Sequence, residues 1–266
     1  MGILLRFTRA SATAFWLSTA FFTSFHALGQ ATPGANPNST LGQLAAAFSG
    51  GQVVQQIQLT GTATWTAGSL VDSGTAALTA STTGSSQMQL NLASTGQRTE
   101  TQTGTGSSAV CQWAGSDGVA HQLSVESCWR PALWFLPAIS LQPSLLQNST
   151  GVVDLGAGTV GASTNIYRHL QGGLLASGLP TGFSTSLATA IAQQSTEDLG
   201  LDPASLLPAV LAYTVHPDNG ASTPIAIEIH YSNYQTVNGV QIPFLIQRYI
   251  NGSLQLSIVV SSAQVG

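Results

Sequence analysis

The chain has 266 residues, only 6% of them are charged, and its formal net charge at pH 7 is −4. All six basic residues are arginines, because the sequence contains no lysine. Nucleic acids and anionic membrane surfaces are bound by clusters of lysine and arginine, so the composition argues against both partners.

The first 29 residues have the organisation of a secretory signal peptide. Arg6 and Arg9 form a positively charged segment, and residues 10–25 are mostly apolar. Small residues follow at the positions that signal peptidase reads, so we expect cleavage before Gln30 and a periplasmic or secreted mature chain. The apolar run is shorter than the ~20 residues of a spanning helix, so we expect no membrane span after cleavage. An uncleaved membrane anchor is the alternative.

A linker and a short helix are expected next. Residues 30–39 are rich in Pro, Asn and Ser and predict a disordered linker. Ser39 predicts the N-cap of a helix that runs to Phe48, because the apolar side chains between them recur on one face. The pair Gly50-Gly51 is expected to end this helix. No charged or low-complexity linker follows, so a single domain is expected over residues 40–266.

Alternating apolar and polar residues predict a series of β-strands after the helix. The alternation is regular over residues 57–65 and 87–92. Three further strands are expected at 75–80, 97–103 and 109–113, with glycines or polar residues at the breaks. Because short turns separate these strands, an antiparallel meander is the simplest arrangement.

Cys111 and Cys128 are the only cysteines in the sequence. In an exported chain an isolated pair of cysteines predicts a disulfide rather than half of a metal site, and two buried free thiols are the alternative. A closed loop of this length would stabilise the fold by roughly 3 kcal/mol.

Aromatic residues are concentrated around this pair of cysteines. Such a cluster forms either ordinary core or the wall of a ligand cavity, because ligand pockets are mostly hydrophobic with a few polar groups. Prolines among these residues rule out a long helix. We expect a ligand-binding surface that consists of Trp65, Trp113, Trp129, Trp134, Phe135 and Leu136. The segment Trp134-Phe135-Leu136 is expected to form a lid over the cavity.

The glycine-rich residues 152–167 predict an extended segment, and a second helix is expected after them. Ser184 predicts the N-cap of this helix, which is expected to run to about Gln194. Leu187 and Ile191 are spaced by about one turn, so both are expected to face the interior.

The last part of the chain predicts three strands joined by two tight turns. Every second residue is apolar over 225–231, 240–246 and 254–260. Asn238-Gly239 and Asn251-Gly252 separate these runs, and Asn-Gly between alternating runs is the strongest short-range signal of a β-hairpin. We expect this meander and the earlier one to belong to the same sheet.

Three segments of the chain follow one another in a characteristic order. They are "LTGTATWTAG" (59–68), "LDPASLLPAVLAY" (201–213) and "YSNYQTVNGVQIPFLIQRYINGSLQLSIVVSSAQV" (231–265). Together they resemble the LolA/LolB-like bacterial lipoprotein carriers and their outer-membrane lipoprotein-sorting relatives, most strongly in the last segment. The resemblance implies an α+β fold, in which a single curved antiparallel β-sheet forms a half-barrel with a few helices in or against its concave face. It also implies an apolar cavity that holds acyl chains.

The stretch Asp72-Ser73-Gly74-Thr75 resembles the catalytic loop of an aspartic protease. Those enzymes need two carboxylates that share one proton, and the best second candidate is Asp154. Leu155 follows it, at the position where those proteases have the Ser or Thr that braces the loop. The alternative is a turn between two strands, in which Asp72 bonds to its own backbone and Gly74 takes a positive φ.

Other catalytic and metal-binding signatures are absent from the sequence. It has no Gly-x-Ser-x-Gly elbow, and its histidines are isolated, so neither an α/β-hydrolase nor a zinc site is predicted. Glu197, Asp198 and Asp202 do not form an EF-hand loop and are expected at a helix end or in a turn.

The sequence therefore predicts an exported, non-enzymatic carrier or binding protein without a cofactor. Its ligand would be a lipid, an acyl chain or an apolar protein segment, held in the concave face of the sheet. Two alternatives stay open. One is a structural or protein-interaction domain whose cavity is filled by its own side chains, and the other is an aspartic-type peptidase that uses Asp72.

Overall fold

The computed structural model describes residues 37–50, 52–104, 109–123, 128, 150–174, 182, 184–216 and 223–266. The chain divides into two units, residues 1–31 and 32–266, and all of the described residues belong to the second. The expected signal peptide lies outside the described residues, and so do four of the expected ligand-binding residues: Trp129, Trp134, Phe135 and Leu136.

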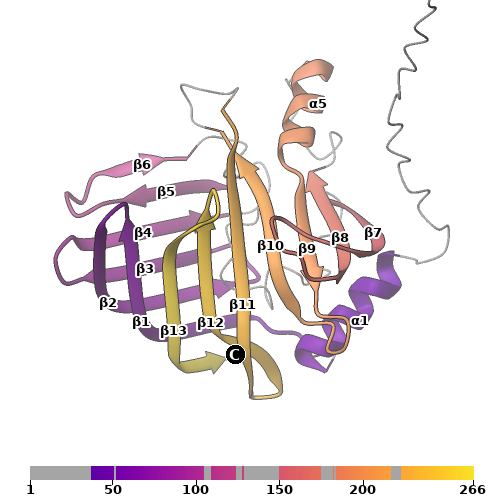
Figure 1. Cartoon of the computed structure of the whole chain (residues 1–266), viewed down its shortest axis with the longest axis horizontal. Helices are drawn as coiled ribbons and strands as arrows, with labels where there is room; N and C mark the ends of the chain where they lie inside the picture. The colour runs from indigo at the N-terminus through magenta and orange to yellow at the C-terminus, as the bar shows by residue number, and fades with distance from the viewer. Residues whose placement is uncertain are drawn as a thin grey trace, which may run out of the picture. The chain divides into compact units, whose positions relative to one another are not determined.

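Two helices and thirteen strands make up the described fold (Figure 1). In chain order they are α1 (Pro37–Ser49), β1 (Gln56–Ala67), β2 (Leu70–Ser81), β3 (Ser86–Leu92), β4 (Gly96–Thr103), β5 (Val110–Ala114), β6 (Ala120–Gln122), β7 (Thr150–Gly158), β8 (Tyr167–Leu174), α5 (Thr185–Gln194), β9 (Glu197–Leu201), β10 (Pro208–Val215), β11 (Ile225–Val237), β12 (Val240–Ile250) and β13 (Ser253–Val265).

All thirteen strands belong to one open antiparallel sheet. Its order is β6-β5-β4-β3-β2-β1-β13-β12-β11-β10-β9-β8-β7, so the first and last strands of the domain are neighbours at its centre. Every other neighbouring pair is consecutive in the sequence, because each half of the sheet is a meander. This arrangement confirms the predicted fold class, a single curved antiparallel sheet with a few helices.

The two Asn-Gly turns of the last meander form as predicted. Asn238 and Gly239 have φ angles of 49° and 81°, and Asn251 and Gly252 have φ angles of 47° and 76°. A positive φ at both central residues is the type I′ geometry, whose twist matches that of the flanking strands. These turns fix the register of β11, β12 and β13.

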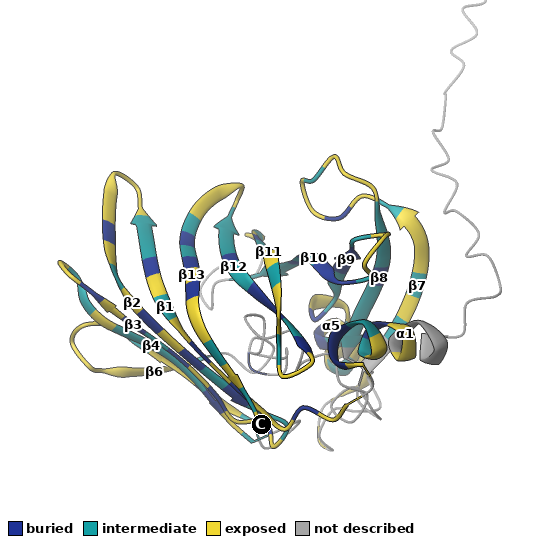
Figure 2. Ribbon diagram, turned by 90° about the horizontal axis from the view of Figure 1, so that it is seen from below, coloured by how far each residue is buried: buried dark blue, intermediate teal, exposed yellow. Residues whose placement is uncertain are grey.

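The hydrophobic core lies on one face of the sheet. Its completely buried members include Ile57, Leu59, Leu78, Leu90, Ile229, Ile242 and Ile258. Along most strands they alternate with less buried residues, as dark and lighter bands show in Figure 2. Helix α1 packs against this core through Leu44 and Phe48, and the ring of Phe48 meets that of Tyr234 edge-on at 6.5 Å. The helix therefore covers the core face beside β12 and β7.

Helix α5 begins where it was predicted, but it buries less than was predicted. The Ser184 side chain accepts a hydrogen bond from the Leu187 backbone N–H at 3.3 Å, which makes Ser184 the N-cap. Ile191 is buried, whereas Leu187 is 46% exposed, so the prediction that Leu187 faces the interior is wrong. Among the described elements the helix packs mainly on β8, so a single buried apolar side chain is enough to hold it there.

Two turn predictions are also wrong. Asp72-Ser73-Gly74 lies within β2 because the turn before it forms at Gly68, which has a φ of 60°. Glu197 and Asp198 lie in strand β9, between β8 and β10, although Asp202 does follow in a turn. Both stretches are polar enough to look like turns, but strands on either side supply their backbone hydrogen bonds.

The close approach of β1 to β13 can be tested at Gly61. A Cβ at this position would overlap the Val259 backbone, so Gly61→Ala is expected to lower the free energy of unfolding by about 1–3 kcal/mol. Gly42→Ala is the matched control, because nothing lies near that position in α1, and it is expected to raise the same free energy by about 0.5–1 kcal/mol. Urea unfolding measures both. Equal effects of the two substitutions would contradict the pairing.

Candidate functional site

A cavity of about 240 Å³ lies on the core face of the sheet. Its apolar floor consists of Trp65 on β1 with Met88 and Leu90 on β3. Three charged side chains lie around this floor, Arg98 and Glu100 from β4 and Arg248 from β12. The cavity therefore combines an apolar base with a charged margin, as small-molecule sites in proteins do.

The strand registers place these side chains on one face. Residues directly opposite each other on neighbouring strands point to the same side of a sheet. Trp65 is opposite Leu256, which is opposite Arg248. Leu90 is opposite Arg98 in the other half of the sheet. Since Leu256 and Leu90 are both buried in the core, the two arginines also point to the core face.

An ion pair between Arg248 and Glu100 shows how strongly the sheet curves. The Nη1 atom of Arg248 lies 2.9 Å from Oε1 of Glu100, although β12 and β4 are five positions apart in the sheet. Five strand spacings measure roughly 24 Å in a flat sheet. Two extended side chains cannot cover that distance, so the sheet must bend toward this face. The cavity accordingly lies on the concave side.

Trp65 lies close to two guanidinium groups. The Cζ atom of Arg98 is 4.7 Å from the centroid of the Trp65 ring, and the Cζ atom of Arg248 is 5.7 Å from it. A cation within about 6 Å of an indole ring is attracted by the negative charge on its face. Trp65 therefore helps to hold both arginines at the cavity.

The two arginines differ in their hydrogen-bond partners. Arg248 donates from Nε to the side-chain oxygen of Gln255 at 2.8 Å and from Nη1 to Glu100 at 2.9 Å. In the part of the chain that the structure describes, the Nε atom of Arg98 is buried without an acceptor, and no carboxylate pairs with its guanidinium. A buried donor without an acceptor costs about 1–3 kcal/mol. The cavity thus contains a positive charge that its own residues do not neutralise.

Trp113 lines the outer wall of the cavity and stacks on His121 beside it. Trp113 on β5 is opposite Glu100 on one side and His121 of β6 on the other. The rings of Trp113 and His121 are stacked, with centroids 4.3 Å apart and planes 19° apart. Trp113 is 41% exposed, so an apolar wall of the cavity reaches solvent at this edge of the sheet.

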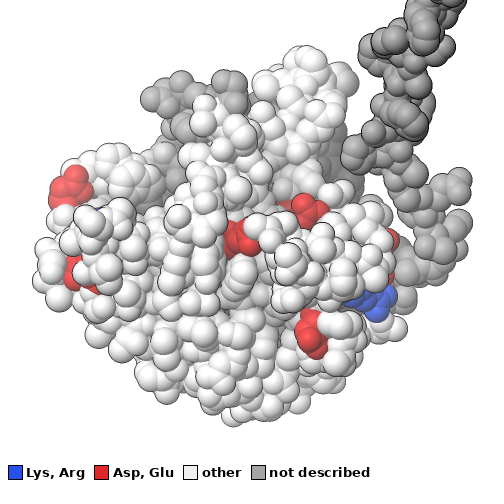
Figure 3. Space-filling view, viewed as in Figure 1, with Lys and Arg blue, Asp and Glu red and all other residues white. Residues whose placement is uncertain are grey.

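The structure brings together only part of the predicted ligand-binding surface. Trp65 and Trp113 were predicted to share one ligand-binding surface, and both line the same cavity. That either residue binds a ligand stays a prediction. The sequence analysis did not identify Arg98, Glu100 and Arg248. One usable signal was available, because Arg98 and Glu100 both lie within the strand predicted at 97–103 in a chain with only 6% charged residues. Figure 3 shows how few charged side chains the face in view carries.

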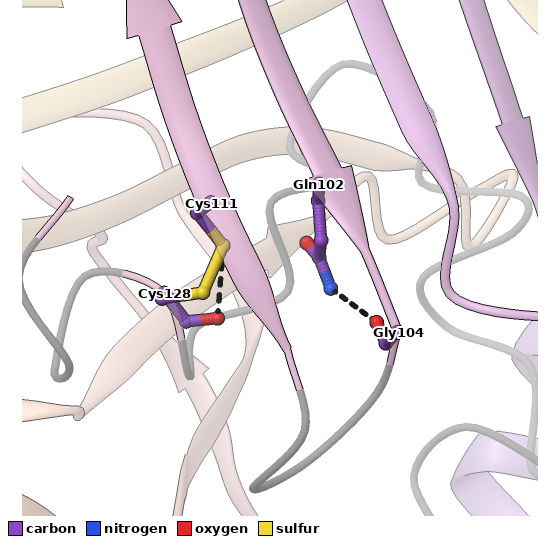
Figure 4. The surroundings of a disulfide bond; sticks show 4 residues. All are labelled: Gln102, Gly104, Cys111 and Cys128. Atoms are coloured by element: carbon purple, nitrogen blue, oxygen red, sulfur yellow. Dashed lines mark hydrogen bonds between the residues drawn. A yellow bond between two sulfur atoms is a disulfide. The ribbon is translucent and has the colours of Figure 1, made fainter. Parts of the chain in front are cut away.

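The predicted disulfide between Cys111 and Cys128 is confirmed. Their Cα atoms are 5.3 Å apart, and both residues are buried (Figure 4). Cys111 lies on β5 opposite Gln102 of β4, whose side-chain amide donates to the Gly104 carbonyl at 3.2 Å. The disulfide therefore attaches Cys128 to the strand that also carries Trp113.

The carboxylate of Asp72 binds to a turn and not to a second carboxylate of the kind that a protease dyad has. Its carboxylate accepts hydrogen bonds from the backbone N–H of Ser94 at 3.1 Å and from the backbone N–H and hydroxyl of Thr95 at 2.6 and 2.8 Å. Asp154 instead pairs with Arg168 at 2.9 Å. Among the described residues, no carboxylate is a hydrogen-bond partner of Asp72. Asp72 thus fixes the turn between β3 and β4.

Hydrogen bonds also set the ionisation of Asp72. Burial by itself raises the pKa of this carboxyl, but the bonds from Thr95 and Ser94 favour the carboxylate and hold the pKa below the ordinary value of 3.8. The carboxylate form therefore stabilises the fold.

The part of the chain that the structure describes has neither a cluster of metal ligands nor a helix long and apolar enough to span a membrane. No three His, Cys, Asp or Glu side chains of that part of the chain gather in a way that could hold a metal ion. None of its helices has the length and hydropathy needed to cross a membrane.

The fold of the chain resembles the folds of several solved structures. No known protein family matches the sequence, and no curated protein does. Among solved structures, a LolA superfamily protein from Nitrosomonas europaea is 11% identical with a TM-score of 0.50, and the match covers 88% of this chain and 94% of that one. A domain assigned to outer-membrane lipoprotein sorting from Vibrio parahaemolyticus is 9% identical with a TM-score of 0.51, covering 86% and 93%.

A third solved structure, a DUF1329 family protein from Desulfovibrio piger, is 10% identical with a TM-score of 0.52, and the match covers 87% of this chain and 94% of that one. Identities this low carry information about the fold alone. At that level the comparisons confirm the resemblance to LolA/LolB-like proteins that the sequence predicted.

The role of Asp72 predicts a specific loss of stability in acid. Folding lowers the pKa of the Asp72 carboxyl below its value of about 3.8 in the unfolded chain. The carboxylate therefore stabilises the folded protein above pH 3.8, and this stabilisation is lost as the pH falls through the pKa of the folded state. Asp72→Asn is therefore expected to be less stable than the parent at pH 7, with a difference that shrinks below pH 3.8. Urea unfolding of both proteins at pH 7 and at about pH 2.5, below the unfolded pKa, measures this difference in the free energy of unfolding. A difference that stays constant with pH would contradict the assignment.

Proposed function

We propose that this chain is an exported, non-enzymatic binding or carrier protein that holds a lipid or acyl chain against the concave face of its sheet. The observation that carries the proposal is the cavity floor of Trp65, Met88 and Leu90, which lies beside a half-exposed tryptophan in a LolA-like fold. The LolA superfamily and lipoprotein-sorting structures share that fold, which supports a periplasmic binding role.

Burial of hydrocarbon would supply the affinity. Each methylene moved from water to the cavity floor contributes about 0.8 kcal/mol. The cavity of about 240 Å³ is slightly smaller than the roughly 300–1,000 Å³ typical of sites for drug-sized ligands. The cavity can hold only part of an amphiphile, and the rest of the acyl chain would extend past Trp113 toward solvent.

The environment of Asp72 favours a binding protein over the peptidase alternative. A protease dyad needs a carboxylate that can share its proton with a second one. Asp72 instead uses its oxygens to bind the Ser94 and Thr95 N–H groups. We therefore propose that Asp72 has a structural role.

Native mass spectrometry of the mature chain, from Gln30 onward, tests the proposal. We expect a population carrying one lipid-sized mass, which denaturation and organic extraction release. Incubation with mixed bacterial lipids should increase that population, because exposed hydrocarbon partitions into the apolar cavity. A chain that stays free of added mass after this incubation would contradict the proposed function and favour a protein-interaction domain.

Substitution at the cavity wall tests where the ligand binds. Trp113→Ala is expected to weaken the binding of 1-dodecanol by about tenfold, since losing roughly 1.4 kcal/mol of apolar contact changes an affinity by that factor. Ile166→Ala is the matched control, because Ile166 is a large apolar residue, 60% exposed, that does not line the cavity. Isothermal titration calorimetry measures both. Equal losses in the two variants would place the ligand elsewhere.

A further inference from the structure

The position of the basic residues suggests what kind of ligand the cavity selects. The sequence has six arginines and no lysine, and two of the six line this one cavity. An arginine placed in a partly buried site loses hydration, which is unfavourable unless something compensates its charge. Glu100 compensates Arg248. Among the described residues, nothing compensates Arg98 in the same way.

The chemistry of Arg98 defines the missing partner. Trp65 attracts its charge but offers no oxygen or nitrogen acceptor to its N–H groups. The buried Nε donor of Arg98 lacks an acceptor within the described structure. A planar guanidinium with a free N–H edge matches a carboxylate or phosphate oxygen, which forms short, charge-assisted hydrogen bonds with it. The cavity is thus suited to an anionic group.

The charges that line the cavity limit the charge of that group. Arg98 and Arg248 are positive and Glu100 is negative, so the lining carries one net positive charge. A single negative charge neutralises it, whereas a dianion would leave one buried charge unpaired. The volume of about 240 Å³ equals that of roughly eight water molecules in the liquid. This space admits a head group and a few methylenes.

We propose that the cavity recognises amphiphiles by a monoanionic head group, and that its ligand is a single-chain fatty acid whose carboxylate binds Arg98. This inference rests on the proposed function. Trp65, which is only partly buried, contacts the first methylenes above the fully buried Met88 and Leu90. Arg248, held by Glu100 and Gln255, adds to the positive potential without being the principal donor. A neutral amphiphile of the same length shares the apolar contacts but leaves Arg98 without its acceptor.

Calorimetry with two amphiphiles of equal chain length tests the proposal on the unmodified mature chain. Sodium laurate and 1-dodecanol, both below their aggregation concentrations, differ only in the head group. We expect laurate to bind about 10- to 100-fold more tightly, the factor that one charge-assisted hydrogen bond supplies. The difference should shrink in high salt, because salt screens the charge. Equal affinities for the two would overturn the inference while leaving the proposed function intact.

Variants assign the difference to one residue. Arg98→Gln is expected to lose the preference for laurate while binding 1-dodecanol as the parent does. Arg168→Gln is the matched control, since Arg168 pairs with Asp154 away from the cavity and should keep the preference. The same loss in both variants would overturn the role of Arg98. If neither amphiphile binds the parent chain, the proposed function itself fails.

A phosphodiester lipid carries the same single charge, so lauroyl-lysophosphatidylglycerol completes the comparison. Tighter binding of laurate, abolished by Arg98→Gln, supports a free carboxylate as the head group. Tighter binding of the lysophospholipid, with the same dependence on Arg98, overturns the fatty acid while upholding a monoanionic head group. Binding of the lysophospholipid that does not depend on Arg98 overturns the site.

Discussion

The pairing of β1 with β13 is the constraint on which the rest of the structure depends. It joins the two meanders into one sheet, and it places the first and last strands at the centre of that sheet. The register shifts between Thr60 and Gly61, where the backbones of Gly61 and Val259 are too close to admit a Cβ. A β-bulge of this kind increases the local twist and bends the strand. This bend contributes to the curvature of the concave face on which the cavity lies.

The cavity depends on the same pairing, because its residues come from both meanders. Trp65 and Arg98 belong to the first meander, and Arg248 belongs to the second. Their meeting creates an electropositive site in a chain that has few charges and a net charge of −4. The ion pair of Arg248 with Glu100 crosses the concave face, so it stabilises the curvature and leaves Arg98 as the uncompensated cation. The position of the cavity, and with it the ligand preference that we propose, therefore depends on this strand pairing.

Most of the fold could be predicted, because its signals are local. Alternating apolar residues and two Asn-Gly pairs identified β11, β12 and β13, and Ser184 identified the start of α5. Asp72 was misjudged because its partners, Ser94 and Thr95, lie more than 20 residues away and only folding brings them near. The charged part of the site was missed for the same reason. Arg98 and Arg248 are 150 positions apart, and no local pattern indicates that both approach Trp65.

A crystal structure of the mature chain grown with laurate tests the central claim most directly. We expect the carboxylate to lie within hydrogen-bond distance of Arg98 and the first methylenes to lie against Trp65. The rest of the acyl chain should leave the cavity beside Trp113. A laurate molecule bound elsewhere on the sheet, or a cavity that stays empty at saturating laurate, would contradict it.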